Sequence, residues 1–354
     1  MFLFAKEIEE QPQALQKLVD NIPSVERELS KIHLHALSSP RIAFFGMGSS
    51  LYSAFASVYL LRSAGISADY YDASEALWHF SQEWFRNVDI CVFVSQSGET
   101  VEIRNLVDKV KRTNVLKMGV TANVNSYLGM NSDIVLDISS GRELSLGSTK
   151  THMNSVVTNI VFSLFITKRL KMERKNIQSL PVLLEEIVSK AREEVNEFSY
   201  FEIADKIEGS VITSRGFALG EVYQSALTLN EIARVSVFAI SAGMLRHGPL
   251  ELFAEKRGII CFIPKSPSAK LLIKLCRDIS HISSFAWIIS DEEVKNDVPN
   301  ESSIHVTSLN TGLAEYLQNL IFLPYIQFLS CKIREMKKIP DDDFRLISKV
   351  TTKE

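Results

Sequence analysis

Small hydrogen-bonding side chains are concentrated in the hexapeptide SQSGET, residues 95–100. The apolar run DICVFV precedes it and the amphipathic run VEIRNLVDKVK follows it, so the hexapeptide joins a predicted buried strand to a predicted helix. Hydroxyl groups at such a place can join the free N–H groups of the helix N-terminus around a phosphate. Gly98 would let the backbone approach that ligand closely. The candidate phosphate ligands are Ser95, Gln96, Ser97 and Thr100.

A second hydroxyl-bearing turn, GMGSS at 46–50, ends an earlier apolar run and contributes Ser49 and Ser50. Either turn alone would be explained by ordinary helix capping. Two such turns in one α/β unit favour a shared anion site. A dinucleotide fingerprint is not supported, because Leu51 stands where its third glycine would be. A GxSxG nucleophile elbow would need glycine at Ser95.

These turns require a parallel sheet to hold them. Short apolar runs alternate with longer amphipathic runs, which is typical of an α/β fold with crossover helices. We predict strands at 41–46, 67–72, 89–95, 115–121 and 133–139, a helix at about 150–171, a helical connector at 176–208, further strands at 209–216, 258–263 and 285–290, and a helix at about 312–332. Gly46 and Ser95 are spaced almost as Gly216 and Ser266 are, so the series is either one unit used twice or two unrelated units.

Composition limits the partners. The chain has 354 residues, 46% of them hydrophobic, and a net charge of -3, with no block of Lys and Arg. We therefore expect a small-molecule ligand and neither nucleic acid nor a membrane as a partner. The four cysteines have no spacing typical of a metal site or a disulfide framework, no apolar run is long enough to span a membrane, and the opening MFLFAKEIEEQP does not fit a signal peptide. We expect a cytoplasmic protein.

Seven segments, taken in order, resemble one family. They are KEIEEQPQAL, FGMGSS, SQSGET, RELSLGSTKT, NEIARV, LRHGPLEL and FRLISKVTTKE, and they extend over nearly the whole chain. The family is the sugar isomerase (SIS) domain in tandem, as in the isomerase half of glucosamine-6-phosphate synthase and in stand-alone aminosugar-phosphate deaminases. Met1 is not followed by the catalytic cysteine of a glutaminase domain, so we do not expect glutamine to supply ammonia within this chain.

The resemblance implies a fold and its domains. Each SIS domain would be a doubly wound, flavodoxin-like parallel sheet between two layers of helices. The implied divisions are an N-terminal helical segment at 1–30, a first SIS domain that binds phosphate at 31–175, the connector at 176–208, a second SIS domain at 209–335 and an active-site tail at 336–354.

The resemblance also assigns roles to residues. It implies that the phosphate is bound by Ser49, Ser50, Ser95, Gln96, Ser97 and Thr100. It also implies that the sugar is lined near its hydroxyl groups by Glu143, Leu146 and Ser148. Capping of the helix at 150 is an alternative for Glu143 and Ser148. Glu231 would be the base that moves a proton between C1 and C2, and partial burial would raise its pKa. His247 would assist ring opening across a dimer interface.

Lys349, together with Arg345, matches the tail that closes the active site in the family. The matching lysine of the synthase forms a Schiff base with the ketose, which needs a neutral amine. Without the resemblance, a lysine in a tail would be read as a mobile side chain in solvent.

Several positions depart from the synthase pattern. Gln224 and Thr228 replace a Glu and a Lys upstream of the catalytic Glu, Phe238 and Met244 replace acids, and Phe344 replaces a proline before Arg345. These changes leave the phosphate loops untouched. They leave the substrate and the protonation network around Glu231 open.

We expect a homodimeric phosphosugar isomerase or deaminase that uses no metal or organic cofactor. The expected reaction converts glucosamine-6-phosphate to fructose-6-phosphate and ammonia, or runs in reverse. One alternative is a deglycase or isomerase for another phosphorylated amine-sugar adduct. Another is a non-catalytic sugar-phosphate sensor, but no effector module is apparent, and Glu231, His247 and Lys349 favour catalysis.

Overall fold

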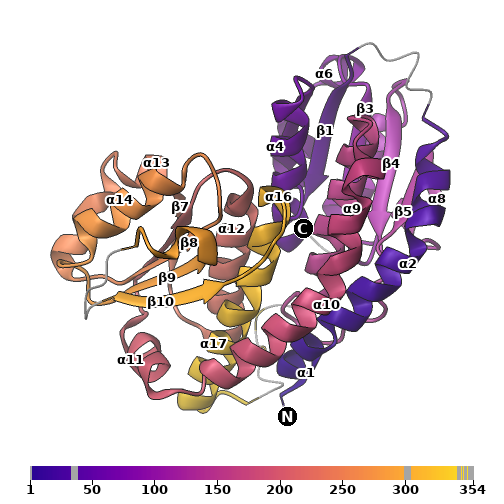
Figure 1. The fold of residues 1–354 in the computed structure, drawn as a ribbon. Helices are drawn as coiled ribbons and strands as arrows, with labels where there is room; N and C mark the ends of the chain where they lie inside the picture. The colour runs from indigo at the N-terminus through magenta and orange to yellow at the C-terminus, as the bar shows by residue number, and fades with distance from the viewer. Residues whose placement is uncertain are drawn as a thin grey trace. The chain divides into compact units, whose positions relative to one another are not determined.

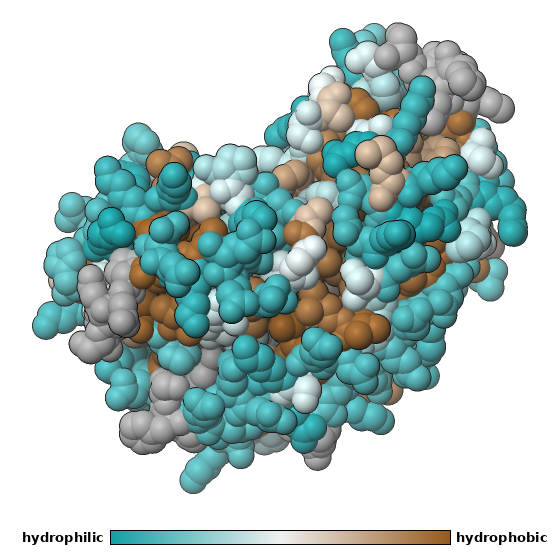
Figure 2. Space-filling model, in the orientation of Figure 1, coloured by the Kyte–Doolittle hydropathy of each residue, from teal (hydrophilic) through white to brown (hydrophobic). Residues whose placement is uncertain are grey.

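The computed structural model describes residues 2–32, 39–298, 304–340, 344, 346 and 349, without the side chains of 198–201. The chain divides into two compact units, each built on one sheet (Figure 1). The first-sheet unit comprises Glu10–Pro181 and Phe344–Glu354, and the second-sheet unit comprises Met1–Glu9 and Val182–Asp343. Hydrophilic residues predominate on the face shown in Figure 2, where hydrophobic residues gather only in limited areas.

The first sheet has five parallel strands in the order β2-β1-β3-β4-β5. The strands are β1 (Arg41–Gly46), β2 (Ser67–Asp72), β3 (Ile90–Val94), β4 (Leu116–Thr121) and β5 (Ile134–Asp137). All five lie within the predicted ranges. The order is that of doubly wound flavodoxin-like folds, which confirms the predicted class.

Helices cover both faces of the first sheet. They are α2 (Gln11–Leu29), α3 (Ser49–Tyr52), α4 (Phe55–Ser63), α5 (Ala73–His79), α6 (Gln82–Arg86), α7 (Val101–Val110), α8 (Tyr127–Met130) and α9 (Lys150–Ile166). Successive side chains of a strand point to opposite faces, so Phe45 and Phe93 pack with residues of α5 to α8, while Phe44 contacts Phe162 of α9. Figure 1 shows α4 and α9 together on one side of this sheet.

The helix predicted to run from 150 to about 171 ends earlier, so that boundary is wrong. α9 stops at Ile166, and Lys168 takes a left-handed conformation with φ 59° before the next helix starts. That helix is α10 (Leu170–Glu194), and α11 (Phe198–Lys206) follows it. Together they form most of the predicted helical connector, and the boundary between the two units falls within α10.

The second sheet is also parallel, in the order β10-β9-β8-β6-β7. Its strands are β6 (Val211–Ser214), β7 (Phe238–Ser241), β8 (Ile259–Ile263), β9 (Ala286–Asp291) and β10 (Ile304–Leu309). Sequence analysis missed β7 and β10. Both are edge strands that are only partly buried, and they lack the continuous apolar runs of the central strands.

Helices again cover both faces. They are α1 (Leu3–Glu9), η2 (Gly216–Ala218), α12 (Leu219–Thr228), the π-helical turn η3 (Leu229–Ala233), α13 (Ala242–Leu245), η4 (Pro249–Glu255), α14 (Ala269–Ile279), α15 (Glu292–Lys295), α16 (Glu315–Gln318), η5 (Asn319–Phe322) and α17 (Leu323–Met336). The helix predicted at about 312–332 is thus three segments, which begin at Glu315 and end at Met336. Apolar residues of α14 cover one face of the sheet, and Tyr325 of α17 meets Trp287 of β9 on the other.

Read from its other edge, the second sheet repeats the first. Its second strand in chain order lies outermost, beside its first, followed by its third, fourth and fifth. The equal strand order supports the interpretation that one unit is used twice. The described helices include none that is long and apolar enough to cross a lipid bilayer.

Candidate functional site

The two hydroxyl-bearing turns lie at the carboxyl ends of neighbouring strands. β1 and β3 pair directly, with Phe45 opposite Phe93, so the turns that follow them emerge side by side from one edge of the sheet. Ser49 and Ser50 begin α3 after β1, and Ser95 follows β3 immediately. In an open α/β sheet this edge is where ligands bind.

The second of these turns, residues 95–100, is held by its own side chains. Ser95 Oγ accepts the Gly98 N–H at 3.1 Å and lies 2.9 Å from Thr100 Oγ1, while Ser97 Oγ accepts the Glu99 N–H at 3.1 Å. Thr100 is the N-cap residue of α7, but its hydroxyl makes no capping bond to that helix. The Thr100 hydroxyl is thus not used to cap α7, and N–H groups at a helix N-terminus are of the kind that bind anions.

Gly98 is required by the geometry of this turn. Its φ is 68°, in the left-handed region, and a Cβ placed on it would lie 1.9 Å from Ser126 Oγ. A side chain at this position would displace either Ser126 or the turn itself.

His152 was missed by sequence analysis. It is buried in α9, and its Nδ1 lies 3.1 Å from the carbonyl oxygen of Ser49, at the start of α3. The partner is a backbone atom far away in sequence, so no motif marks the contact. The burial of nearly every residue of α9, polar ones included, is the structural feature that draws attention to it.

Glu143 is fully buried and organises the segment that precedes α9. Its carboxylate accepts hydrogen bonds from the N–H and hydroxyl groups of both Thr149 and Thr151. Two of these donors are N–H groups at the N-terminus of α9, so the capping role that remained open from the sequence is observed for Glu143. Ser148 and Leu146 are half-buried beside it.

Lys349 docks against this segment. Its Nζ lies 2.8 Å from Glu143 Oε2 and 3.3 Å from the carbonyl oxygen of Leu146, and its side chain is only 24% exposed. The reading of a mobile tail lysine in solvent therefore does not hold here. Arg345, which was expected to accompany it, lies outside the described residues.

The pKa of Glu143 reflects two opposed effects. Burial disfavours the charged carboxylate, but the Lys349 ammonium, with the Thr151 hydroxyl and the Thr149 N–H, holds the pKa below its ordinary value. These contacts favour the charged form of the Glu143 carboxylate. A lysine nitrogen attacks a carbonyl carbon only as the neutral amine.

Glu231 belongs to the second-sheet unit, where it is half-buried in the π-helical turn η3 between buried neighbours such as Leu229 and Ile232. A π-helical turn within a helix is rare and is frequent at functional sites. One turn upstream, Gln224 Nε2 donates to Thr228 Oγ1 at 3.2 Å, and both side chains are buried. A neutral hydrogen-bonded pair thus stands where the resemblance implies charged residues.

His247 lies in the same unit, in the turn after α13, and is exposed. Its neighbour Met244 is 60% exposed and Phe238 is 45% exposed.

The structure thus divides the predicted residues between its units. The first-sheet unit contains Ser49, Ser50, Ser95, Gln96, Ser97, Thr100, Glu143, Leu146, Ser148 and Lys349, and the second-sheet unit contains Glu231 and His247. Among the described residues, no group of three or more His, Cys, Asp or Glu side chains is arranged to hold a metal ion.

The class of protein that this fold defines is a tandem arrangement of two α/β domains, each built on a five-stranded parallel sheet. Residues 37–167 match the model of the SIS domain.

Known relatives agree in fold. Human glutamine–fructose-6-phosphate aminotransferase [isomerizing] 2 is 24% identical over 328 residues, 89% of this chain and 46% of that protein. The chain spans about half the length of the curated relatives it matches. The C-terminal domain of glucosamine-fructose-6-phosphate aminotransferase from Francisella tularensis has a TM-score of 0.84 at 23% identity, covering 95% of this chain and 96% of that one. Glucosamine-6-phosphate deaminase from Thermotoga maritima has a TM-score of 0.69 at 18% identity, covering 95% and 98%.

Proposed function

We propose that this protein is an aminosugar-phosphate isomerase or deaminase that interconverts glucosamine-6-phosphate with fructose-6-phosphate and ammonia. The observation that carries the proposal is the first-sheet unit itself. It combines a hydroxyl-lined anion turn at its strand ends with an amine, Lys349, docked on the buried carboxylate of Glu143. A phosphate site and a lysine amine in one unit suit a phosphorylated substrate that reacts through an imine.

The proposed steps assign one task to each group. The turns at 46–50 and 95–100 bind the phosphate, and His247 assists opening of the sugar ring. Glu231 takes the proton from C2 and returns it to C1, while the C1 oxygen gains a proton and the C2 amino group loses one, so that the amino aldehyde becomes a hydroxymethyl imine at C2. Transfer of that imine to the Lys349 amine releases ammonia, and water then hydrolyses the lysine imine to the ketose.

A homodimer is part of the proposal. The exposed position of His247 supports the homodimer, because a side chain at the surface of one chain can contact a second subunit. We also propose a cytoplasmic location, as expected from the composition.

The test is incubation with a panel of hexosamine and ketose phosphates while ammonia and product sugars are measured. Glucosamine-6-phosphate should yield ammonia and fructose-6-phosphate in equal amounts, and Glu231→Gln should lower the rate by about 100-fold or more. Full activity of the Glu231→Gln variant would contradict the proposal.

A second candidate, a deglycase or isomerase for another phosphorylated amine-sugar adduct, is favoured by the buried Gln224 and Thr228 pair. Gln224 and Thr228 form a neutral pair one turn before Glu231, whereas the family has a Glu and a Lys at these positions. The substrate's amino group would therefore meet different charges in this protein. Turnover of an N-substituted amine-sugar phosphate, without ammonia release from glucosamine-6-phosphate, would select this candidate.

A further inference from the structure

Arg334, near the end of α17, is among the largest fully buried side chains of the described residues. A guanidinium stays charged in proteins, and its removal from water is unfavourable unless hydrogen bonds and nearby groups compensate. The partners of Arg334 therefore indicate what this buried charge does for the fold.

Arg334 joins three segments of the second-sheet unit. Its Nη1 donates to the carbonyl oxygen of Ile232 at 2.9 Å, and its Nη2 donates to the carbonyl oxygen of Pro340. Its guanidinium carbon lies 4.9 Å from the centre of the Phe2 ring, a cation–π arrangement. One side chain thus connects the π-helical turn, Pro340 and Phe2, the residue before α1.

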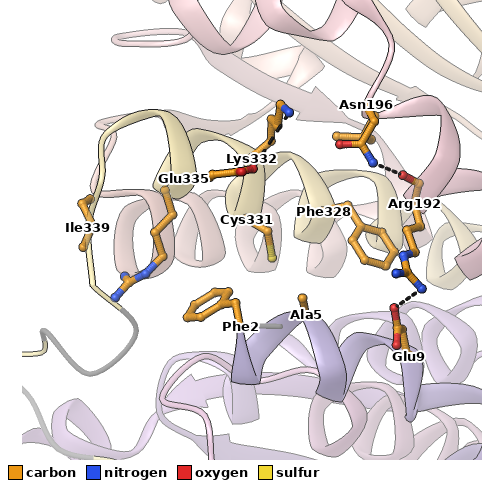
Figure 3. A pocket seen from close by; sticks show the side chains of 12 residues that line it. Phe2, Ala5, Glu9, Arg192, Asn196, Phe328, Cys331, Lys332, Glu335 and Ile339 are labelled. Atoms are coloured by element: carbon orange, nitrogen blue, oxygen red, sulfur yellow. Dashed lines mark hydrogen bonds and ion pairs between the residues drawn. The ribbon is translucent and has the colours of Figure 1, made fainter.

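A cavity of about 470 Å³ lies beside this contact, and Arg334 is one of its lining residues. Figure 3 shows Phe2, which precedes α1, and Ala5 of α1 on one side of it and Phe328 and Cys331 of α17 on the other. The cavity leaves space beside position 334, and lysine and methionine are no larger than arginine. Either residue would therefore fit there without overfilling the site.

The π-helical turn needs support at its C-terminal end. Ile232 follows Glu231 directly, and the turn closes at Arg234, whose φ of 50° lies in the left-handed region that a side chain disfavours. Lys337 Nζ donates to the Arg234 carbonyl oxygen at 2.8 Å. Two cations at the end of α17 therefore bind the carbonyl group of Ile232, within the turn, and that of Arg234, which ends it.

We propose that Arg334 is a positioning residue for Glu231, which it places by fixing the π-helical turn. The inference rests on the proposed function, in which Glu231 is the base. A base that serves two adjacent carbons must be held closely, since a displacement of about 1 Å can cost on the order of 100-fold in rate.

The test compares Arg334→Lys with Arg257→Lys. Arg257 serves as the control because it is an exposed arginine of the same unit that donates to a backbone carbonyl outside residues 229–235, that of Glu208 at 3.3 Å. Lysine at 334 keeps the charge but cannot reach both carbonyl groups in the same way. We expect kcat to fall by roughly 10- to 100-fold with KM nearly unchanged. In a Glu231→Gln background the same change should cause little further loss, because Arg334 acts through Glu231.

Amide hydrogen exchange provides a readout that does not need activity. Exchange of residues 229–235 should accelerate by about tenfold or more in Arg334→Lys relative to Arg257→Lys. Unchanged exchange there, or an undiminished kcat loss in the Glu231→Gln background, would overturn the inference. If Glu231→Gln is itself fully active, the proposed function fails, and the exchange data alone decide whether Arg334 holds the turn.

Discussion

At the scale of single residues, removal of the hydroxyl groups of Ser97 and Thr100 tests the phosphate site. Each would donate to a charged group, and such a bond contributes about 1.5 to 3 kcal/mol. The Ser97→Ala/Thr100→Ala double variant should therefore bind sugar phosphate at least about 100-fold more weakly in calorimetric titration. Ser81→Ala is the control, because Ser81 caps α6 in the same unit and belongs to neither turn. Equal affinity in the double variant would remove the phosphate from these turns.

Glu143 makes stability depend on pH. The pKa of Glu143 is lowered in the folded protein from its ordinary value of 4.5. Its ionised form therefore contributes stability above that value, and this contribution is lost as the pH falls through the lower folded pKa. Urea unfolding of the wild type should show a decrease in the free energy of unfolding over that range. In Glu143→Gln the free energy of unfolding should depend less on pH over that range, whereas in Glu83→Gln, at an exposed site, its dependence on pH should be unchanged. Identical pH slopes for all three proteins would exclude the assigned role.

Lys349 can be tested by trapping. If it forms an imine with a ketose phosphate, borohydride reduction should link the sugar irreversibly to the chain, and mass spectrometry should place the label on Lys349. Lys349→Met should abolish the label. Because Glu143 would lose its ammonium partner, we also expect a loss of stability in this variant, so folding must be checked by circular dichroism. A label on another lysine would end the Schiff-base role.

At the scale of elements, the turn after β3 depends on Gly98. Alanine there must adopt a left-handed φ and would clash with Ser126, so the turn should rearrange while the strands below it remain. We expect Gly98→Ala to lose sugar-phosphate binding with a destabilisation of about 1 to 3 kcal/mol. Gly65→Ala serves as control, since its φ of 79° is similar but no atom lies within 4 Å of the added Cβ. Comparable binding in both variants would contradict this prediction.

The elements also show what a sequence can and cannot predict. The central strands β1 and β3 were predictable because they are continuous apolar runs, and the turns that follow them because their hydroxyl groups are contiguous. Edge strands β7 and β10 were not, since half-exposed strands carry mixed residues. The π-helical turn was not predictable either. Its support comes from Arg334, and the partner of Glu143 is Lys349, contacts between residues far apart in the chain.

At the scale of the whole molecule, activity should require two subunits. If His247 serves the site of a partner chain, a Glu231→Gln protein and a His247→Ala protein should each be strongly impaired, while their mixture should recover activity through heterodimers with one intact site. Ammonia release after verified subunit exchange is the measurement. No recovery in exchanged mixtures would place both residues in the site of one chain.

The two compact units do not correspond to two continuous stretches of chain. Helix α1 belongs to the unit built mainly from the second half, and the last residues, Lys349 among them, belong to the unit built mainly from the first. A chain divided between Pro181 and Val182 would yield two fragments, each of which holds a piece that the other unit needs. We therefore expect the two halves of the chain to regain the native structure when they are expressed together, and neither half to fold completely on its own.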